Sequence, residues 1–218
     1  MRKRATIKVD GRVYADVAST PEATCFVPWR SPRGAKMLLG FSKTRDFRTW
    51  AEEHGFGEAV DCVLQRLARV RASYSRKPSK SQQAKLRAMQ VQRLRLARGR
   101  VLAVLRRLGA GPRDPESLAK LARDYDPIEG PPFASCFLFR YTGYAGSYVY
   151  LPSGFAYPAF SWFGFDNRAS SAIELGVTTV LFQYSWFGGR TLWLIGVFSS
   201  DDLADFDFDN RTSSAIVE

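Results

Sequence analysis

Two six-residue segments near the end of the chain carry a dense set of oxygen donors. They read Asp166-Asn167-Arg168-Ala169-Ser170-Ser171 and Asp209-Asn210-Arg211-Thr212-Ser213-Ser214. Each offers carboxylate, amide and hydroxyl oxygens, and neither contains a thiol or an imidazole. Ca²⁺ takes about six to eight oxygen ligands of these kinds. The pattern favours a hard-cation site in each hexapeptide, and one carboxylate per segment predicts an affinity of about micromolar or weaker.

The two hexapeptides belong to an internal repeat. Residues 137–175 align with residues 180–218 without a gap, and 15 of the 39 aligned positions are identical. A repeat of fixed period indicates one supersecondary unit that is used twice. The repeat unit therefore has to position both hexapeptides in the same way.

Each copy also contains an aromatic residue, a second aromatic residue five positions later and a glycine two positions after that. These residues are Phe139, Tyr144 and Gly146 in the first copy and Phe182, Phe187 and Gly189 in the second. A hairpin that folds back over a sheet needs glycine where φ is positive and aromatic rings to cover the bend. We expect the last serine of each hexapeptide, Ser171 or Ser214, to hydrogen-bond the exposed backbone of its hairpin.

The hairpin motif and the hexapeptide together resemble the βγ-crystallin Greek-key family, specifically its microbial calcium-binding members. Both motifs occur in both copies in the same order, between residues 133 and 218. The resemblance implies that two Greek keys, at about 133–176 and 177–218, form one β-sandwich. It also implies two bound Ca²⁺ ions, each held by groups from both keys.

The resemblance assigns ligands as well. It places on the metal the side chains of the Asx pairs, the carbonyl of the third hexapeptide residue and the hydroxyl of the fifth. These are Asp166, Asn167, Arg168 and Ser170 in the first copy, and Asp209, Asn210, Arg211 and Ser213 in the second. A backbone carbonyl of Arg140 or Gln183 is expected to reach the ion of the other key. Asx-rich turns with serine also occur without a metal, so a purely structural role stays open.

The positive charge of the chain is concentrated in one segment. The net charge is +11, but residues 62–113 alone hold 15 basic and no acidic residues, whereas residues 131–218 sum to −4. Such asymmetry indicates two parts with different partners. Residues 62–113 are expected to engage a polyanion (nucleic acid or an anionic surface) or an acidic protein. The alternative is a basic helical bundle whose charges only face solvent.

Helical patterns fill the middle of the chain. Thr44 is expected to cap a first helix that stops at Gly55. Residues 57–72 carry apolar side chains on one face at helical spacing, and residues 81–108 form the longest predicted helix, which also carries an apolar stripe. A short helix is placed near residues 116–124. Short β-rich pieces lie within residues 5–41, and a period of two begins after Pro132.

These patterns predict an α+β fold with two domains. Residues 1–130 are expected to form a mainly helical basic domain with a few short strands, which resembles no module that we recognise. Residues 131–218 are expected to form an all-β, βγ-crystallin-like Greek-key sandwich. The linker is placed at residues 126–132, where proline and glycine cluster and the sign of the charge changes.

Little in the sequence supports catalysis. His54 is the single histidine, and the chain has no Ser/Cys-His constellation, phosphate-binding loop or dinucleotide-binding loop. Cys25, Cys62 and Cys136 fit no metal spacing and predict free thiols in a reducing compartment. No apolar run follows the basic start and none is long enough to span a membrane, so we expect a cytoplasmic protein, with leaderless secretion left open.

The preferred interpretation is a non-enzymatic calcium-binding protein. Its sandwich binds up to two Ca²⁺ ions for stability or ordering and is fused to a basic helical interaction domain. Two alternatives stay open. One is a secreted protease-inhibitor-like or toxin-like effector on the same scaffold, and the other is a nucleic-acid-associated protein that uses the basic helices.

Overall fold

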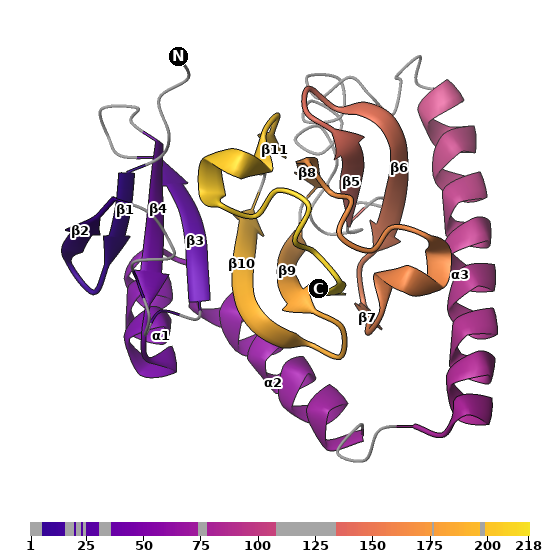
Figure 1. Cartoon of the computed structure of the whole chain (residues 1–218), viewed down its shortest axis with the longest axis horizontal. Coiled ribbons are helices and arrows are strands. Elements are labelled where there is room, and N and C mark those ends of the chain that lie inside the picture. Colours follow the sequence, from indigo (N-terminus) through magenta and orange to yellow (C-terminus); the bar gives the residue numbers. More distant parts are fainter. Residues whose placement is uncertain are drawn as a thin grey trace.

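A computed structural model of the chain describes residues 6–15, 20, 23, 25–30, 36–73, 78–107, 134–175, 177–196 and 199–218. The described strands are β1 (Thr6–Val9), β2 (Arg12–Tyr14), β3 (Cys25–Arg30), β4 (Lys36–Phe41), β5 (Ser135–Tyr141), β6 (Ala145–Pro152), β7 (Phe155–Tyr157), β8 (Ser171–Leu175), β9 (Val177–Tyr184), β10 (Gly188–Gly196), β11 (Ser199–Ser200) and β12 (Ser214–Val217). The helices are α1 (Thr44–Glu53), α2 (Gly57–Ser73) and α3 (Lys80–Arg107), with short 3-10 helices η2 (Phe160–Phe163) and η3 (Leu203–Phe206). The chain is α+β, as the sequence predicts (Figure 1).

Two sheets build the centre of the molecule. Sheet A has eight strands in the order β2-β1-β4-β3-β10-β9-β12-β7, and sheet B has four in the order β11-β8-β5-β6. β7 of the first repeat pairs with β12 of the second in sheet A, while β11 of the second repeat pairs with β8 of the first in sheet B. Each repeat thus gives three strands to one sheet and one strand to the other. This exchange is a pair of Greek keys, so a βγ-crystallin-like sandwich is present in residues 134–218.

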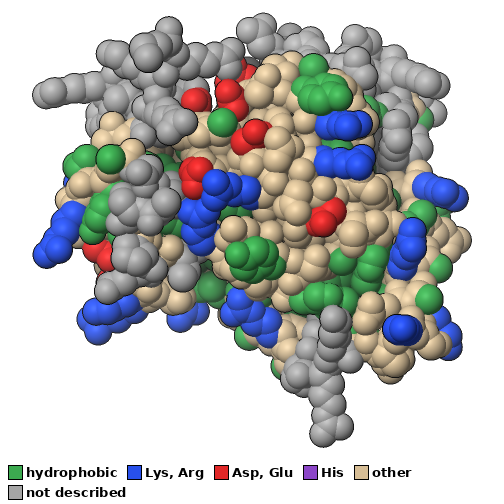
Figure 2. Space-filling model, viewed as in Figure 1, with side chains coloured by type: hydrophobic (Ala, Val, Ile, Leu, Met, Phe, Trp, Pro, Cys, Tyr) green, Lys and Arg blue, Asp and Glu red, His purple; other side chains and the backbone are tan. Residues whose placement is uncertain are grey.

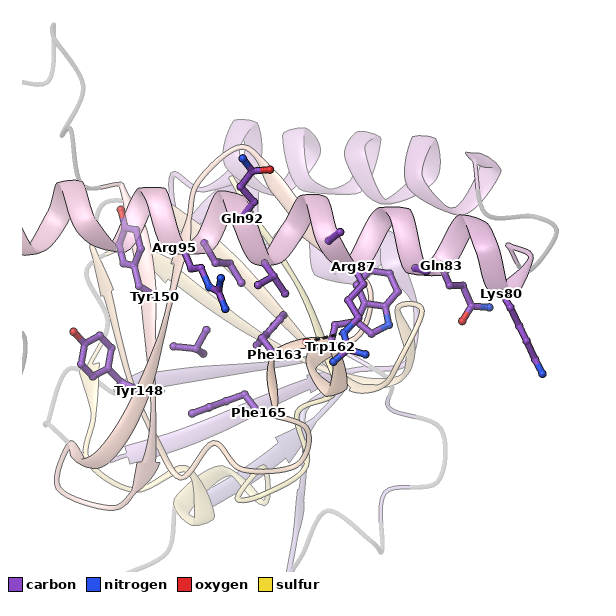
Figure 3. Close-up of a pocket in the computed structure, with 15 residues that line it drawn as sticks. Lys80, Gln83, Arg87, Gln92, Arg95, Tyr148, Tyr150, Trp162, Phe163 and Phe165 are labelled. Carbon is purple, nitrogen blue, oxygen red and sulfur yellow. Dashed lines mark hydrogen bonds between the residues drawn. The ribbon is translucent and has the colours of Figure 1, made fainter.

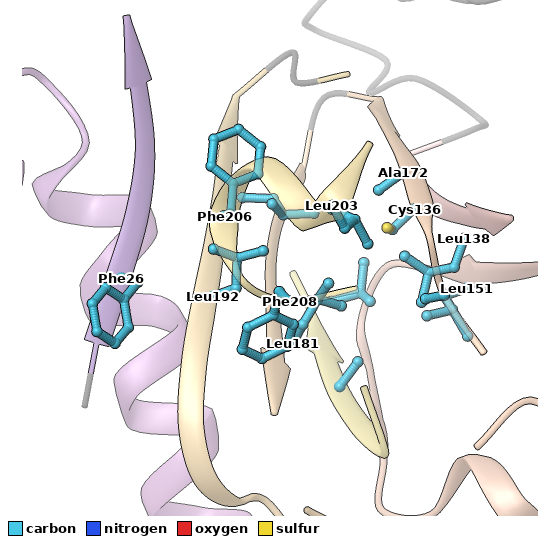
Figure 4. Packing of buried hydrophobic residues seen from close by; sticks show 14 of the residues in the cluster. Phe26, Cys136, Leu138, Leu151, Ala172, Leu181, Leu192, Leu203, Phe206 and Phe208 are labelled. Atoms are coloured by element: carbon cyan, nitrogen blue, oxygen red, sulfur yellow. The ribbon is translucent and has the colours of Figure 1, made fainter. Parts of the chain in front are cut away.

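The inner faces of the two sheets share one apolar core (Figure 4). Leu138 and Leu151 of sheet B and Leu181 and Leu192 of sheet A are completely buried in it. Phe26, on β3, belongs to the same cluster although it precedes the predicted linker by about a hundred residues. The core of the repeats is therefore shared with the N-terminal part of the chain.

The N-terminal strands extend sheet A. β3 pairs in parallel with β10, with Cys25 opposite Thr191 and Phe26 opposite Leu192. On the outer face of the sheet, buried side chains of α1 and α2 pack against those of β9, β10 and β12. The predicted split into two domains is not confirmed, because one sheet and two apolar clusters contain residues from both sides of it. The expected linker and the expected helix at 116–124 lie outside the described residues.

The helices agree with the sequence patterns except in two details. Thr44 is the first residue of α1 rather than its cap, because Lys43 occupies the capping position and makes no side-chain capping bond. α3 was expected to bury an apolar stripe, yet only Leu94 of its described residues is buried, and Met89 is 41% exposed. Most of the described side chains of α3 are exposed. None of the helices in the described ranges is long and apolar enough to cross a membrane.

Candidate metal centre

The two hexapeptides follow equivalent 3-10 helices and adopt the same backbone shape. η2 ends on Gly164 at φ 73° and η3 ends on Asp207 at φ 53°, both in the left-handed region. Asn167 and Asn210 lie at φ 50° and 51°. Asparagine and aspartate tolerate this conformation better than most residues because their short polar side chains bond locally. The Asx positions therefore set the shape of both loops.

Reciprocal backbone hydrogen bonds join the two loops. Asn167 N–H donates to the Thr212 carbonyl at 2.9 Å, and Asn210 N–H donates to the Ala169 carbonyl at 2.8 Å. Each bond of one repeat has its equivalent in the other, so the loops are related by an approximate twofold axis. Any ligand at one loop consequently lies beside atoms of both repeats.

The structure brings oxygen donors of different repeats together. Ser213 Oγ donates to Asn167 Oδ1 at 3.2 Å, so the fifth residue of the second hexapeptide lies on the Asx pair of the first. Ser213 N–H also donates to the Phe182 carbonyl at 3.0 Å, which places the neighbouring Gln183 at the same end. On the other side, Ser170 N–H donates to the Phe139 carbonyl at 2.8 Å, beside Arg140. Coordination of a metal by these residues stays a prediction.

One carboxylate oxygen in each loop is buried without a hydrogen-bond partner. These atoms are Asp166 Oδ1 and Asp209 Oδ1, which occupy equivalent positions in the repeat. The other oxygen of Asp209 accepts from Asn210 Nδ2 at 3.0 Å. An unpartnered buried carboxylate oxygen costs free energy, and a cation would compensate it. The same unsatisfied atom in both repeats fits the predicted cation.

The donor set suits calcium better than a transition metal. Within the described residues, His, Cys, Asp and Glu form no group of three or more that could hold a metal ion. Sites for zinc and similar metals are built mainly from thiolate and imidazole ligands, which neither loop supplies. Calcium accepts amide, hydroxyl and backbone oxygens, so one carboxylate per loop is compatible with it.

An ion pair distinguishes the second loop from the first. Asp207 accepts from Arg211 at 3.2 Å and from Arg190 at 3.3 Å. Gly164 stands at the equivalent position of the first repeat, and no ion pair in the described part of the chain includes Arg168. The sequence did not indicate this role of Asp207, because residues 207–211 form a loop and not a helix. Asp202 caps η3, since its side chain accepts a 2.9 Å hydrogen bond from Ala204 N–H.

Asp207→Asn is expected to weaken calcium binding at the second loop by about twofold to fivefold. The substitution leaves Arg190 and Arg211 without their partner, and exposed charge pairs contribute up to about 1 kcal/mol. Calorimetric titration with Ca²⁺ would measure the change, with Asp46→Asn on α1 as the control. Equal weakening at both sites would show that Asp207 has no local effect.

The last serine of each hexapeptide holds its hairpin, as expected. Ser171 Oγ donates to the Tyr141 carbonyl at 2.7 Å and accepts from Tyr144 N–H at 3.1 Å. In the second repeat Ser214 makes the equivalent bonds to Tyr184 and Phe187, at 2.7 and 3.1 Å. The hexapeptide is thereby fixed to a folded hairpin on one side and to the other repeat on the other side.

Ser214→Ala is expected to lower the free energy of unfolding by about 1–3 kcal/mol. The substitution leaves a backbone donor and a backbone acceptor of the hairpin without their partner, and such loss in a buried place carries this cost. Urea denaturation of the full chain measures it. Ser199→Ala, at an exposed serine, should change the stability by less than about 0.5 kcal/mol; a similar loss in both variants would refute the assignment.

The solved structures to which this chain is similar match its β-sandwich. No protein-family model matches the chain, and no curated protein matches its sequence. Among solved structures, a βγ-crystallin from Ciona intestinalis is 20% identical, covers 38% of this chain and 99% of its own, and gives a TM-score of 0.36. A βγ-crystallin from an archaeon is 20% identical over 38% of this chain and 95% of its own, with a TM-score of 0.34. A βγ-crystallin domain from Flavobacterium johnsoniae is 21% identical over 38% and 92%, with a TM-score of 0.33. These similarities concern the fold alone.

Proposed function

We propose that the chain is a non-enzymatic calcium-binding protein whose sandwich holds up to two Ca²⁺ ions at the hexapeptide loops. The observation that carries the proposal is the pair of equivalent buried oxygens, Asp166 Oδ1 and Asp209 Oδ1, which have no hydrogen-bond partner. The contact between Ser213 and Asn167 supports a ligand set drawn from both repeats. The remaining ligands would be the other residues that the resemblance assigns.

We further propose that calcium stabilises the sandwich and does not reshape it. The backbones of the two loops already bond each other, so an ion between them would reinforce a contact that exists without it. A ligand that binds only the native state raises the free energy of unfolding, by about 2.7 kcal/mol per site at a hundredfold excess over Kd. For a chain of this length that corresponds to about 5–10 °C in Tm for each occupied site.

Thermal unfolding of the full chain tests this proposal. Ca²⁺ is expected to raise Tm by the amount given above and a chelator to reverse the effect. Mg²⁺ at the same ionic strength should raise Tm much less, because it requires a smaller octahedral site and gives up its water reluctantly. Equal shifts from both ions would indicate general charge screening and would contradict a calcium site.

A further inference from the structure

A groove separates α3 from the edge of the sandwich and encloses about 990 Å³ (Figure 3). Its sandwich side consists of β6 and the segment around η2, and its other side is one face of α3. Five aromatic residues line the first side: Tyr148, Tyr150, Trp162, Phe163 and Phe165. Three basic residues line the second: Lys80, Arg87 and Arg95. None of the described residues that line the groove is acidic.

The aromatic side offers ring surface at fixed positions. Tyr150 and Phe165 are each 5% exposed and form the floor, whereas Tyr148, Trp162 and Phe163 are partly exposed. Trp162 packs edge-on against Trp186 with ring centroids 5.7 Å apart. This contact restricts the movement of the Trp162 indole. Partly exposed rings on a rigid support are suited to stacking against a planar ligand.

Basic side chains of α3 form the opposite side of the groove. Arg87 Nε donates to the Trp162 carbonyl at 3.2 Å, which holds the guanidinium beside the indole. Arg95 is exposed and points into the space between α3 and the sheet (Figure 3). Lys80, Arg87 and Arg95 are about two helical turns apart, so they share one face of α3. Figure 2 shows Lys and Arg side chains spaced along the edge that α3 forms.

Two other basic residues of the charged segment, residues 62–113, contact the sandwich itself. Arg66 of α2 donates to the Gly154 carbonyl at 2.9 Å and pairs with Glu218, and Arg71 donates to the Phe187 carbonyl at 3.0 Å. These side chains fasten α2 to the sandwich. Among the described basic residues of the segment, those on the groove face of α3 combine exposure with neighbouring aromatic rings.

We propose that this groove binds single-stranded nucleic acid. Bases would stack on Trp162, Phe163 and Tyr148 while Arg87, Arg95 and Lys80 pair with phosphates. This combination of a basic wall and a stacking platform is how single strands are bound without sequence preference. Duplex bases are already stacked on one another and offer no free face, so a single strand fits the groove better than a duplex. An anionic membrane would use the charge but not the rings.

Fluorescence anisotropy with a labelled oligo(dT) of about 12 nucleotides and the full chain tests the proposal. With about three phosphate contacts, affinity should fall about twentyfold between about 50 and 200 mM salt. Trp162→Leu should weaken binding at least about fivefold, the lower limit for loss of one stacked base. Arg95→Gln should reduce the salt slope by about 0.7.

Lys85→Gln is the matched control, because Lys85 is an exposed basic residue of α3 that does not line the groove. It should leave the salt slope and the affinity close to those of the wild type. The proposal is overturned if the oligonucleotide does not bind at about 50 mM salt, or if Lys85→Gln and Arg95→Gln weaken binding equally. It is also overturned if duplex DNA or phosphatidylserine vesicles bind as tightly and Trp162→Leu has no effect.

Discussion

Ser213→Arg is expected to abolish the calcium-dependent stabilisation that the first repeat's loop contributes, about 2.7 kcal/mol at a hundredfold excess of Ca²⁺ over Kd. The hydroxyl of Ser213 lies 3.2 Å from Asn167 Oδ1, so the substitution removes an oxygen from that loop and introduces a cation beside it. The damage should therefore appear at the loop of the other repeat. Thermal unfolding with and without Ca²⁺ measures the loss.

Two further variants test the role of the Ser213 hydroxyl even if arginine disturbs folding at this buried position. Ser213→Ala removes the same oxygen without adding bulk and should reduce the calcium-dependent shift in Tm. Ser161→Arg places the same new side chain at an exposed site on η2 and should leave the shift unchanged. A wild-type calcium response in Ser213→Ala would mean that the serine hydroxyl is not a ligand.

Glu174→Gln is expected to remove a loss of stability that the wild type shows as the pH rises above about 4.5. Glu174 is completely buried on β8, opposite Cys136 of β5. Burial raises the pKa of this carboxyl well above its ordinary value of 4.5, and hydrogen bonding to Thr179 offsets that rise only in part. Val217 stands at the equivalent position of the second repeat.

The direction of the pH effect follows from proton binding. Above pH 4.5 the unfolded chain releases the Glu174 proton while the folded chain keeps it, so the folded state binds more protons. The stabilisation is complete below the unfolded pKa and is lost as the pH rises through the folded pKa. Within that interval the free energy of unfolding falls by up to about 1.4 kcal/mol per pH unit.

Urea denaturation at several pH values between about 5 and 8 measures how steeply the free energy of unfolding falls with pH. The glutamine variant should show a flatter profile and should be more stable than the wild type at the upper end. Glu53→Gln, at an exposed position of α1, should keep the wild-type slope. A wild type and a Glu174→Gln variant with the same slope would mean that Glu174 titrates as an exposed carboxyl does.

The parts of the fold that the sequence predicted are those fixed by local patterns. The repeat predicted one supersecondary unit used twice, because identical aromatics, glycines and serines at one period favour one backbone shape. The resemblance to βγ-crystallins implied that this unit is a Greek key. α2 was predicted almost to the residue, since its apolar face has a strict helical spacing and a polar opposite face. The bonds of Ser171 and Ser214 to their hairpins were also predicted, because they lie within one repeat.

Contacts between distant segments could not be predicted in this way. Nothing local indicates that β3 pairs with β10, because parallel pairing depends on where two separated segments meet. The apolar stripe predicted for α3 did not identify the face that meets the sandwich, because only Leu94 of its described residues is buried. The burial of Glu174 was not predicted either, because it depends on how the two sheets pack together. In the candidate site, the residue types were predicted, but the contact of Ser213 with the opposite loop required the structure.

Calorimetric titration of the full chain with Ca²⁺ tests the central claim most directly. The proposed loops predict saturable binding of up to two ions in the micromolar range or weaker. The variant with both Asp166→Asn and Asp209→Asn keeps the shape of each loop but removes the carboxylates, and it should bind no calcium measurably. Absence of binding by the wild type, or unchanged binding by the double variant, would contradict a calcium centre at these loops.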